Sequence, residues 1–259
     1  MKIKFLSILS LAVILFTACT SDSTSEEFDD NNPDAVARLI TEIAIVSAQN
    51  PIDNTTISVS YDANNRVTSI TDGVETNTLV YNNDDSLTNV AGPGETLNVQ
   101  DLYDDSPFEA FEYGEVIDYD SNNNPLNIRI YDYEYNFNTG MEETIEYRAL
   151  ITYDDKPNPY FYTLQAAGAI EIMDNVELNF SSEMNAPELI QARLLFPSRN
   201  VSGVTITNLA GQVLTEVVAN YVYNSDNYPT SGTITETSYE NGMVDETNVV
   251  SMTYAYLVN

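Results

Sequence analysis

The sequence predicts an all-β protein built as an antiparallel meander of repeated β-hairpins. Three observations indicate this fold class. A short segment that begins with Tyr followed by Asp or Asn recurs five times along the 259 residues. Between the copies, apolar and polar residues alternate with the period of two that is typical of half-buried strands. Turn dipeptides such as Asp72-Gly73 separate other strands. We expect a curled or two-layer sheet, because either form protects the strand edges.

The recurring segment, which we call the Tyr-Asx repeat, has the chemistry of a tight turn. Its Tyr closes an incoming strand, where an aromatic ring packs well. The Asp or Asn that follows can bond to the main chain two residues further on. Each copy ends in Val, Leu or Pro. The five copies are Tyr61–Val67, Tyr81–Leu87, Tyr119–Pro125, Tyr153–Pro159 and Tyr223–Pro229.

The fifth residue of each repeat is expected to have a positive φ, because a three-residue hairpin loop needs a left-handed residue. Asn and Asp are the non-glycine residues that tolerate this conformation best. The fourth copy has Pro157 at this place, and proline cannot adopt a positive φ. There we expect Asn158 to take the role, in a loop longer by one residue. In the other copies the expected residues are Asn65, Asp85, Asn123 and Asn227.

In the first half of the chain, strands are expected on both sides of the repeats. Thr56–Tyr61 alternates Ile57, Val59 and Tyr61 with Thr and Ser. Val36–Ser47 alternates in the same way; a helix is the alternative there, but the density of β-branched residues favours a strand. The other strands expected in this half are Val67–Thr71, Thr76–Tyr81, Leu87–Val90, Glu95–Leu102 and Phe111–Tyr119.

In the second half, a short helix near residues 187–195 is expected to interrupt the strands. Asn185 can cap it, Pro187 suits a first turn, and Glu188 lies near the positive end of the helix dipole. The strands expected around it are Leu126–Phe137, Glu142–Tyr153, Val201–Leu209, Gln212–Tyr223, Thr230–Tyr239 and Val244–Leu257.

The first 18 residues have the features of a lipoprotein signal peptide. Lys2 and Lys4 form a charged region, and Phe5–Phe16 is apolar but too short to span a membrane. The segment that ends in Cys19 resembles the lipobox of bacterial lipoproteins, although Phe16 stands where Leu is usual. The resemblance implies that Cys19 is lipidated and anchors the chain to a membrane. An ordinary secretory peptide with an incidental Cys is the alternative.

Residues 19–34 are expected to form a flexible acidic tether before a single domain over residues 35–259. The segment is rich in Ser, Thr, Asp, Glu and Asn, and Phe28 is its one aromatic residue. Such a composition buries too little apolar surface to order itself. Its acidic pairs, Glu26-Glu27 and Asp29-Asp30, resemble the surface-export signal of Bacteroidota lipoproteins. A plain solvated linker explains them equally well.

Charge and composition exclude several functions. Nine Lys and Arg stand against 40 Asp and Glu, for a formal charge of -31. Nucleic-acid binding and docking on anionic lipid are therefore not expected. The chain has no His, so the usual nucleophile–base pairs and histidine metal ligands are missing. We expect no enzyme, no catalytic residues and no cofactor. The alternatives are a carboxylate-based hydrolase, with acidic pairs such as Asp104-Asp105 and Glu142-Glu143, and a calcium loop at residues 120–124.

The repeats resemble the tyrosine-aspartate hairpin repeats of RHS-type proteins. Together with the lipobox and Ser198-Arg199-Asn200 before a late strand, they resemble more closely a group of Bacteroidota surface lipoproteins of unknown function. This resemblance implies an outer-membrane lipoprotein on the cell surface, with a periplasm-facing protein as the alternative. RHS shells have many regular copies and a processed toxin region, which this chain lacks, so encapsulation is not implied.

The function expected from these features is that of a non-catalytic envelope module that binds a glycan or a protein partner. The chain has 18 Tyr, and exposed aromatic rings on a rigid sheet suit either ligand. Exposure of the row Tyr131, Tyr133 and Tyr135 would favour binding. Burial of that row would favour the alternative, a purely structural envelope lipoprotein.

Overall fold

The computed structural model describes residues 23–99, 114–137, 139–175, 177–179, 189–191 and 196–257. In this part of the chain, thirteen strands form one antiparallel sheet, which confirms the predicted all-β meander. The strands are β1 (Ile40–Ser47), β2 (Thr55–Tyr61), β3 (Val67–Thr71), β4 (Thr76–Tyr81), β5 (Leu87–Ala91), β6 (Thr96–Asn98), β7 (Gly114–Tyr119), β8 (Pro125–Asn136), β9 (Met141–Pro157), β12 (Arg199–Asn208), β13 (Val213–Tyr223), β14 (Pro229–Glu240) and β15 (Met243–Tyr256).

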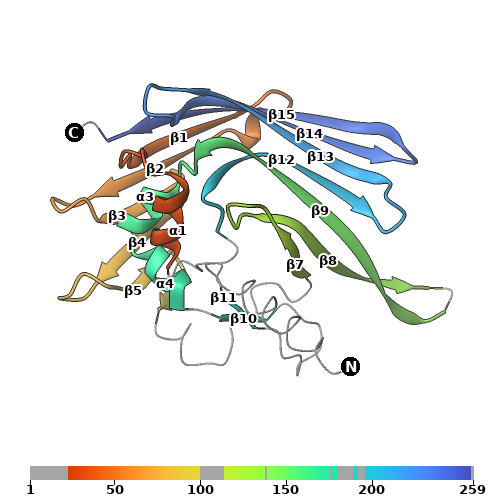
Figure 1. Ribbon diagram of the computed structural model, residues 1–259, viewed down its shortest axis with the longest axis horizontal. Coiled ribbons are helices and arrows are strands. Elements are labelled where there is room, and N and C mark those ends of the chain that lie inside the picture. Colours follow the sequence, from red (N-terminus) through yellow and green to blue (C-terminus); the bar gives the residue numbers. More distant parts are fainter. Residues whose placement is uncertain are drawn as a thin grey trace, which may run out of the picture.

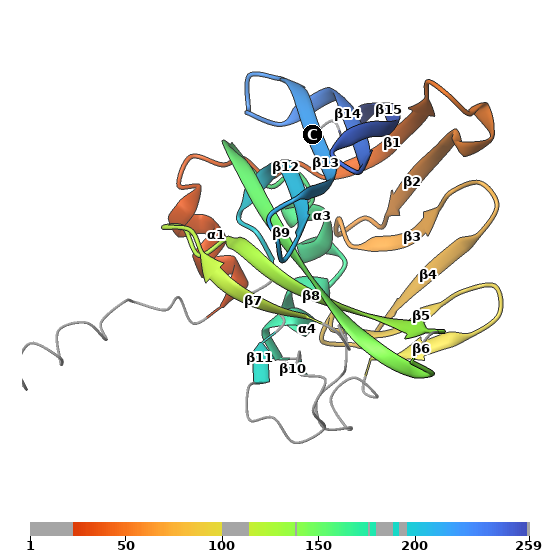
Figure 2. The same cartoon turned by 90° about the vertical axis from the view of Figure 1, so that its right-hand side faces the viewer.

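The sheet is a single curled layer whose two halves meet at a pair of strands far apart in sequence. Its order is β6-β5-β4-β3-β2-β1-β15-β14-β13-β12-β9-β8-β7. Strand β15 pairs with β1, with Tyr256 opposite Ile40. Strand β12 pairs with β9. In the two views of Figures 1 and 2, the sheet curves around the helices, which lie on its inner side.

Four Tyr-Asx repeats form the predicted hairpins with one shared geometry. In the first, the main-chain N–H of Asp62 donates to Arg66 O at 2.9 Å. Asp62 Oδ1 accepts from the main-chain N–H groups of Asn64 (2.8 Å) and Arg66 (3.0 Å). Asn82, Asp120 and Asn224 make the same three bonds. The positive φ expected in these turns is confirmed at Asn65 (63°), Asp85 (70°), Asn123 (59°) and Asn227 (65°).

The prediction for the fourth repeat is wrong. Strand β9 continues through Tyr153 as far as Pro157, and Asn158 does not have a positive φ. Asn158 instead accepts a bond from the main-chain N–H of Tyr160, just before a helix. Pro157 cannot take the left-handed place, so no turn closes there. A further hairpin at Asn208 makes two of these three bonds, from the main-chain N–H of Asn208 to Gln212 O and from the N–H of Gln212 to Asn208 Oδ1, and Gly211 has a φ of 78° there.

The left-handed residues give a direct test of this geometry. Replacing Asn65 by Gly should leave the free energy of unfolding nearly unchanged. Replacing Asn65 by Val should cost about 1 kcal/mol or more, because a β-branched side chain clashes at positive φ. Asn227 should behave in the same way. Denaturant melts of the two variants check this, and equal stability of the Gly and Val proteins would contradict it.

The expected flexible tether is wrong over Thr24–Asn31, which form helix α1. Ser23 caps the helix by accepting from the main-chain N–H of Glu26 at 3.2 Å. Glu26 and Glu27 lie in the first turn, where the dipole favours acidic residues. Phe28 is fully buried. The tether prediction failed because a single aromatic residue, Phe28, is enough to hold the segment against the folded domain when that domain supplies a pocket for the ring.

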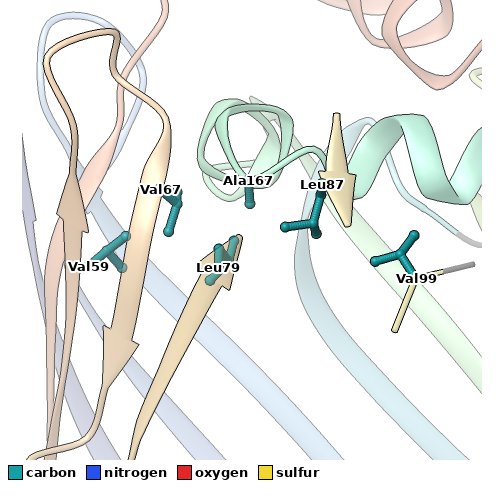
Figure 3. Packing of buried hydrophobic residues seen from close by; sticks show 6 residues of the cluster. All are labelled: Val59, Val67, Leu79, Leu87, Val99 and Ala167. Atoms are coloured by element: carbon teal, nitrogen blue, oxygen red, sulfur yellow. The ribbon is translucent and has the colours of Figure 1, made fainter. Parts of the chain in front are cut away.

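Helices α3 (Phe161–Ala166) and α4 (Ala169–Asn175) cover the inner face of strands β2 to β5. Ala167, between them, packs with apolar side chains from the strands (Figure 3). Gly168 has a φ of 76°, and a Cβ there would meet Leu87 Cβ at 3.1 Å. The close approach of helix and sheet therefore requires a glycine. The buried cluster contains Val59, Val67, Leu79, Leu87, Val99 and Ala167.

The short helix expected near residues 187–195 is also wrong where the chain is described. Leu189–Gln191 form strand β11, which pairs with β10 (Glu177–Asn179). Pairing between strands thus decides the structure of this stretch, although its sequence carries a helix start signal. Residues 187–188 and 192–195 lie outside the described residues. A 3-10 helix, η1 (Pro51–Asp53), lies in the loop between β1 and β2.

Candidate functional site

The turns of the sheet lie at two opposite rims with different chemistry. In an antiparallel sheet, successive hairpin turns alternate between the two ends of the strands. We call the rim that carries the repeat turns the repeat rim; these turns are 62–66, 82–86, 120–124 and 224–228. We call the opposite rim the tip rim; its connections are 48–54, 72–75, 92–95, 137–140, 209–212 and 241–242.

The repeat rim is polar, and its tyrosines serve the fold. Apart from Ala63 and the fully buried Tyr228, its turn residues are Asp, Asn, Ser and Arg. Hydroxyl groups of several tyrosines donate to a main-chain carbonyl oxygen at the start of the neighbouring strand. These bonds are Tyr61 to Ile40 (2.6 Å), Tyr81 to Val67 (2.7 Å), Tyr153 to Pro125 (2.6 Å) and Tyr256 to Pro229 (2.8 Å). A hydroxyl used in this way joins two neighbouring strands.

Burial raises the pKa of these phenols. It raises the pKa of Tyr81 to about 12 and that of Tyr221 to about 12. The pKa values of Tyr61, Tyr153 and Tyr256 are also raised, with desolvation as the largest cause. The neutral hydroxyl is therefore the form that the fold stabilises.

These raised pKa values predict loss of stability in alkali. Unfolded Tyr ionises near pH 10, whereas Tyr81 in the fold ionises near pH 12. The contribution of the neutral phenols is thus fully present below pH 10 and is lost as the pH rises toward their folded pKa. Denaturant midpoints should stay constant from about pH 8 to about pH 9.5 and fall above that. A midpoint that is unchanged at about pH 11.5 would contradict this account.

An open groove of about 500 Å³ lies beside the third and fourth repeats, but its polar groups are already engaged. Asp120 accepts from Asn122 and Asn124. Asp154 Oδ2 accepts from the hydroxyl of Tyr223. Arg199 donates to the carbonyl oxygens of Asp155 and Asn31. The groove is therefore part of the framework. Its lining is Asp120, Asn122, Leu126, Ile151, Thr152, Tyr153, Asp154, Asp155 and Arg199.

The calcium loop and the acidic pairs gain no support from the geometry. Both carboxylate oxygens of Asp120 accept bonds within their own turn, which accounts for the Asp and Asn residues of 120–124 without a metal. Among the described residues, no group of three or more His, Cys, Asp or Glu is placed to hold a metal ion. Asp104 and Asp105 lie outside the described residues, and Glu143 is exposed on β9, where it accepts from Asn136 Nδ2 at 2.7 Å.

The tip rim, by contrast, exposes large apolar side chains. Of the large hydrophobic side chains that the structure describes as at least 60% exposed, all but Val222 lie in these connections or within two residues of them. The most exposed are Val74 (91%), Ile52 (89%) and Phe137 (89%). The ring of Phe137 makes an edge contact with Tyr135 at 5.1 Å. The other members of the set are Met141, Leu209, Met243 and Val244.

Three long hairpins carry most of this set to one side of the molecule. The tips of β8–β9, β12–β13 and β14–β15 lie at the right of Figure 1. Phe137, Leu209 and Met243 stand at these tips. Exposed carboxylates accompany the apolar groups, among them Glu240, Asp245 and Glu246 beside Met243. Hairpin tips normally carry small polar residues, so this combination of exposed apolar and acidic groups is consistent with a contact surface.

Sequence reasoning missed the tip rim because it assigned residues such as Phe137 and Leu209 to strand ends and Ile52 to a turn, without asking which of them are exposed. The signal was present in Phe137 and Met141, which flank the Asn138-Thr139-Gly140 turn, and in Leu209 and Met243 next to turns. Of the row Tyr131, Tyr133 and Tyr135, the structure describes the side chain of Tyr135, which is 52% exposed. The row therefore does not decide between binding and burial. Cys19 lies outside the described residues.

Comparisons with known proteins assign no family. No protein-family model matches the sequence, and no curated protein matches it. Two solved structures are porin-like proteins. The one from Bacteroides uniformis has 12% identity and a TM-score of 0.41 over 84% of this chain and 98% of that chain. The one from Bacteroides vulgatus has 10% identity and a TM-score of 0.37 over 85% and 99%.

A third solved structure is a putative outer membrane lipoprotein-sorting protein domain from Vibrio parahaemolyticus. It has 10% identity and a TM-score of 0.26 over 90% of each chain. With TM-scores this low, the likenesses assign neither fold family nor function. Within the described residues, no helix has the length and apolar character needed to cross a bilayer.

Proposed function

We propose that the protein is a non-catalytic, lipid-anchored β-sheet module of the bacterial envelope that binds a protein partner through its tip rim. The anchor is Cys19, and the outer membrane, with the domain facing the cell exterior, is the proposed location. The observation that carries the binding role is the set of exposed apolar side chains at the hairpin tips, led by Phe137, Leu209 and Met243. The proposed location at the outer membrane rests on the lipobox that ends in Cys19.

Chemistry favours a protein partner over a glycan. Glycan recognition would use several exposed tyrosine rings, but among the described tyrosine side chains only Tyr135 and Tyr160 are exposed. The hydroxyls of Tyr61, Tyr81 and Tyr153 donate within the sheet. The apolar side chains at the hairpin tips, such as Leu209 and Met243, instead suit apolar pockets on the surface of a protein. The exposed acidic residues beside the tips favour a partner protein that has Lys and Arg around those pockets. The same acids oppose insertion of the tips into an anionic lipid surface.

The apolar tips can supply useful affinity. Burying one large apolar side chain contributes about 1.5–3 kcal/mol, and a few such anchors dominate most interfaces. Three tips that engage together therefore supply about 4.5–9 kcal/mol, and the polar and acidic contacts around them add to this against the entropy of association. The rigid sheet holds the tips in place, which lowers the ordering cost.

A triple variant tests the proposal. Phe137→Ser, Leu209→Ser and Met243→Ser should together weaken binding of the partner about 100-fold or more, because each change removes an anchor worth more than about 1 kcal/mol. The matched control places exposed changes on the repeat rim, Ala63→Ser, Asn83→Ser and Ser225→Ala, and should bind as the wild type does. Affinity is measured with full-length protein and the partner identified by crosslinking.

Two outcomes would contradict the proposal. Equal loss in the two triple variants would show that the tip rim is not the contact surface. Hydrolysis of a polysaccharide or peptide that disappears on replacing one Asp or Glu would overturn the non-catalytic role. If no protein contacts the tips in cells, the binding role fails and a purely structural lipoprotein is the better description.

A further inference from the structure

Helix α1 is fixed to the folded domain along its whole length. At its start, the main-chain N–H and the hydroxyl of Thr24 both donate to Asp174 Oδ1 on α4, at 2.7 and 2.5 Å. In its middle, the ring of Phe28 stacks on Phe161 of α3, with centroids 3.7 Å apart and planes within 2°. Thr24 and Phe28 are both buried. Two helices of the domain thus hold the first turn and the centre of α1.

The end of α1 is bound to the sheet as firmly. Asn32 Nδ2 donates to Ser198 O at 3.0 Å. Asn31 Nδ2 donates to Asn122 O at 2.9 Å, and Arg199 donates to Asn31 O. These partners belong to the third repeat turn and to the start of β12. The segment before β1 is therefore a docked part of the fold as far back as Ser23.

We propose that α1 acts as a docked spacer that fixes the domain close to the lipid surface with the α1–α4 side turned toward the bilayer. The inference rests on the proposed lipidation of Cys19. Three residues separate Cys19 from Ser23, and a chain of this length reaches at most about 14 Å. If α1 were undocked, the free segment would extend to Ala35, with a reach of roughly 55 Å.

Charge on this side indicates how the domain is held. Glu26, Asp29 and Asp30 of α1 and Glu171 of α4 are exposed. They oppose adsorption to anionic headgroups, so the covalent lipid and the short spacer, and not charge attraction, keep the domain at the surface. In Figure 1, α1 lies left of centre and the three long hairpin tips lie at the right. Docking of α1 thus leaves the tips accessible to a partner.

Energy transfer to a membrane dye tests the spacer. The lipidated full-length protein is placed on phosphatidylcholine vesicles that contain an acceptor lipid, with a donor dye on Glu171→Cys. A lipidated Cys19 leaves this as the one free thiol, because the chain has a single Cys. Three further proteins are compared: a 12-residue Gly/Ser insertion between Asp22 and Ser23, Asp174→Ala, and the control Phe137→Ala. The insertion adds roughly 20 Å of mean reach.

Transfer should be strong in the wild type and in Phe137→Ala, and should fall about twofold or more with the insertion. Asp174→Ala, which frees the start of α1, should give a value between these two. Equal transfer in the wild type and the insertion variant would overturn the proposal, and so would an unchanged value in Asp174→Ala. Failure of lipidation is distinguished by mass spectrometry and by protein that does not bind vesicles at all.

Discussion

Replacing Phe28 by alanine is expected to lower the free energy of unfolding by about 3–5 kcal/mol. Phe28 is 0% exposed, and its ring stacks on Phe161, which is 1% exposed. The rings of Phe28 and Tyr162 make an edge contact, with their centroids 5.5 Å apart. The change removes the apolar contact area and leaves a cavity against Phe161 that the helices cannot fill without moving. Phe28 thus contributes as much to the free energy of unfolding as a residue in the centre of the core does, although the segment around it has the composition of a flexible tether.

Denaturant melts of the wild type and Phe28→Ala measure this loss. The matched control is Phe137→Ala, the same change at a ring that is 89% exposed, which should alter the free energy of unfolding by no more than about 0.5 kcal/mol. Similar values for the two variants would show that α1 is not docked in solution. That result would also remove the basis of the spacer proposal.

Replacing Asn124 by alanine is expected to cost about 3 kcal/mol or more. Asn124 is fully buried. Its Oδ1 accepts from the main-chain N–H of Ser198 (2.7 Å) and from the Ser198 hydroxyl (3.0 Å). Its Nδ2 donates to Asp120 Oδ2 at 2.9 Å. Alanine leaves the buried N–H and hydroxyl of Ser198 without this acceptor and the half-buried Asp120 without this donor, and each buried group so affected costs about 1–3 kcal/mol.

The control for Asn124 is Ser86→Ala, at the same place in the second repeat. Ser86 accepts from Asn82 Nδ2 at 2.6 Å in an exposed turn, so its loss should cost no more than about 0.5 kcal/mol. Denaturant midpoints at neutral pH compare the two variants. A loss in Asn124→Ala as small as that in Ser86→Ala would show that the third repeat does not join β7–β8 to the start of β12.

Local chemistry explains what the sequence could predict. The four repeat turns depend on residues that lie next to one another, such as Asp62 and Asn65, so their positive φ followed from turn chemistry alone. The positions of the strands followed from the alternation of apolar and polar residues. The order of the strands in the sheet could not be predicted in this way, because the pairing of β15 with β1 joins residues that are more than two hundred positions apart in the chain.

The errors arose where distant contacts decide the structure. Helix α1 depends on Phe161 and Asp174, neither of which is near Phe28 in sequence. The tyrosines were expected to offer binding rings, but the role of Tyr81 as a donor to Val67 appears only once two strands are paired. The binding surface that we propose lies at exposed residues such as Leu209, which alternation assigned to a strand end. Their exposure depends on how far each hairpin extends, and alternation does not reveal that length.

Photocrosslinking in intact cells tests the central claim, binding through the tip rim, most directly. A photoreactive amino acid is placed singly at Phe137, Leu209 or Met243, and singly at Asn64, Asn83 or Ser225 on the repeat rim. The account predicts adducts with the same envelope protein at the three tips and none at the repeat rim. Adducts of that protein from both rims alike, or no protein adduct at any tip, would contradict it.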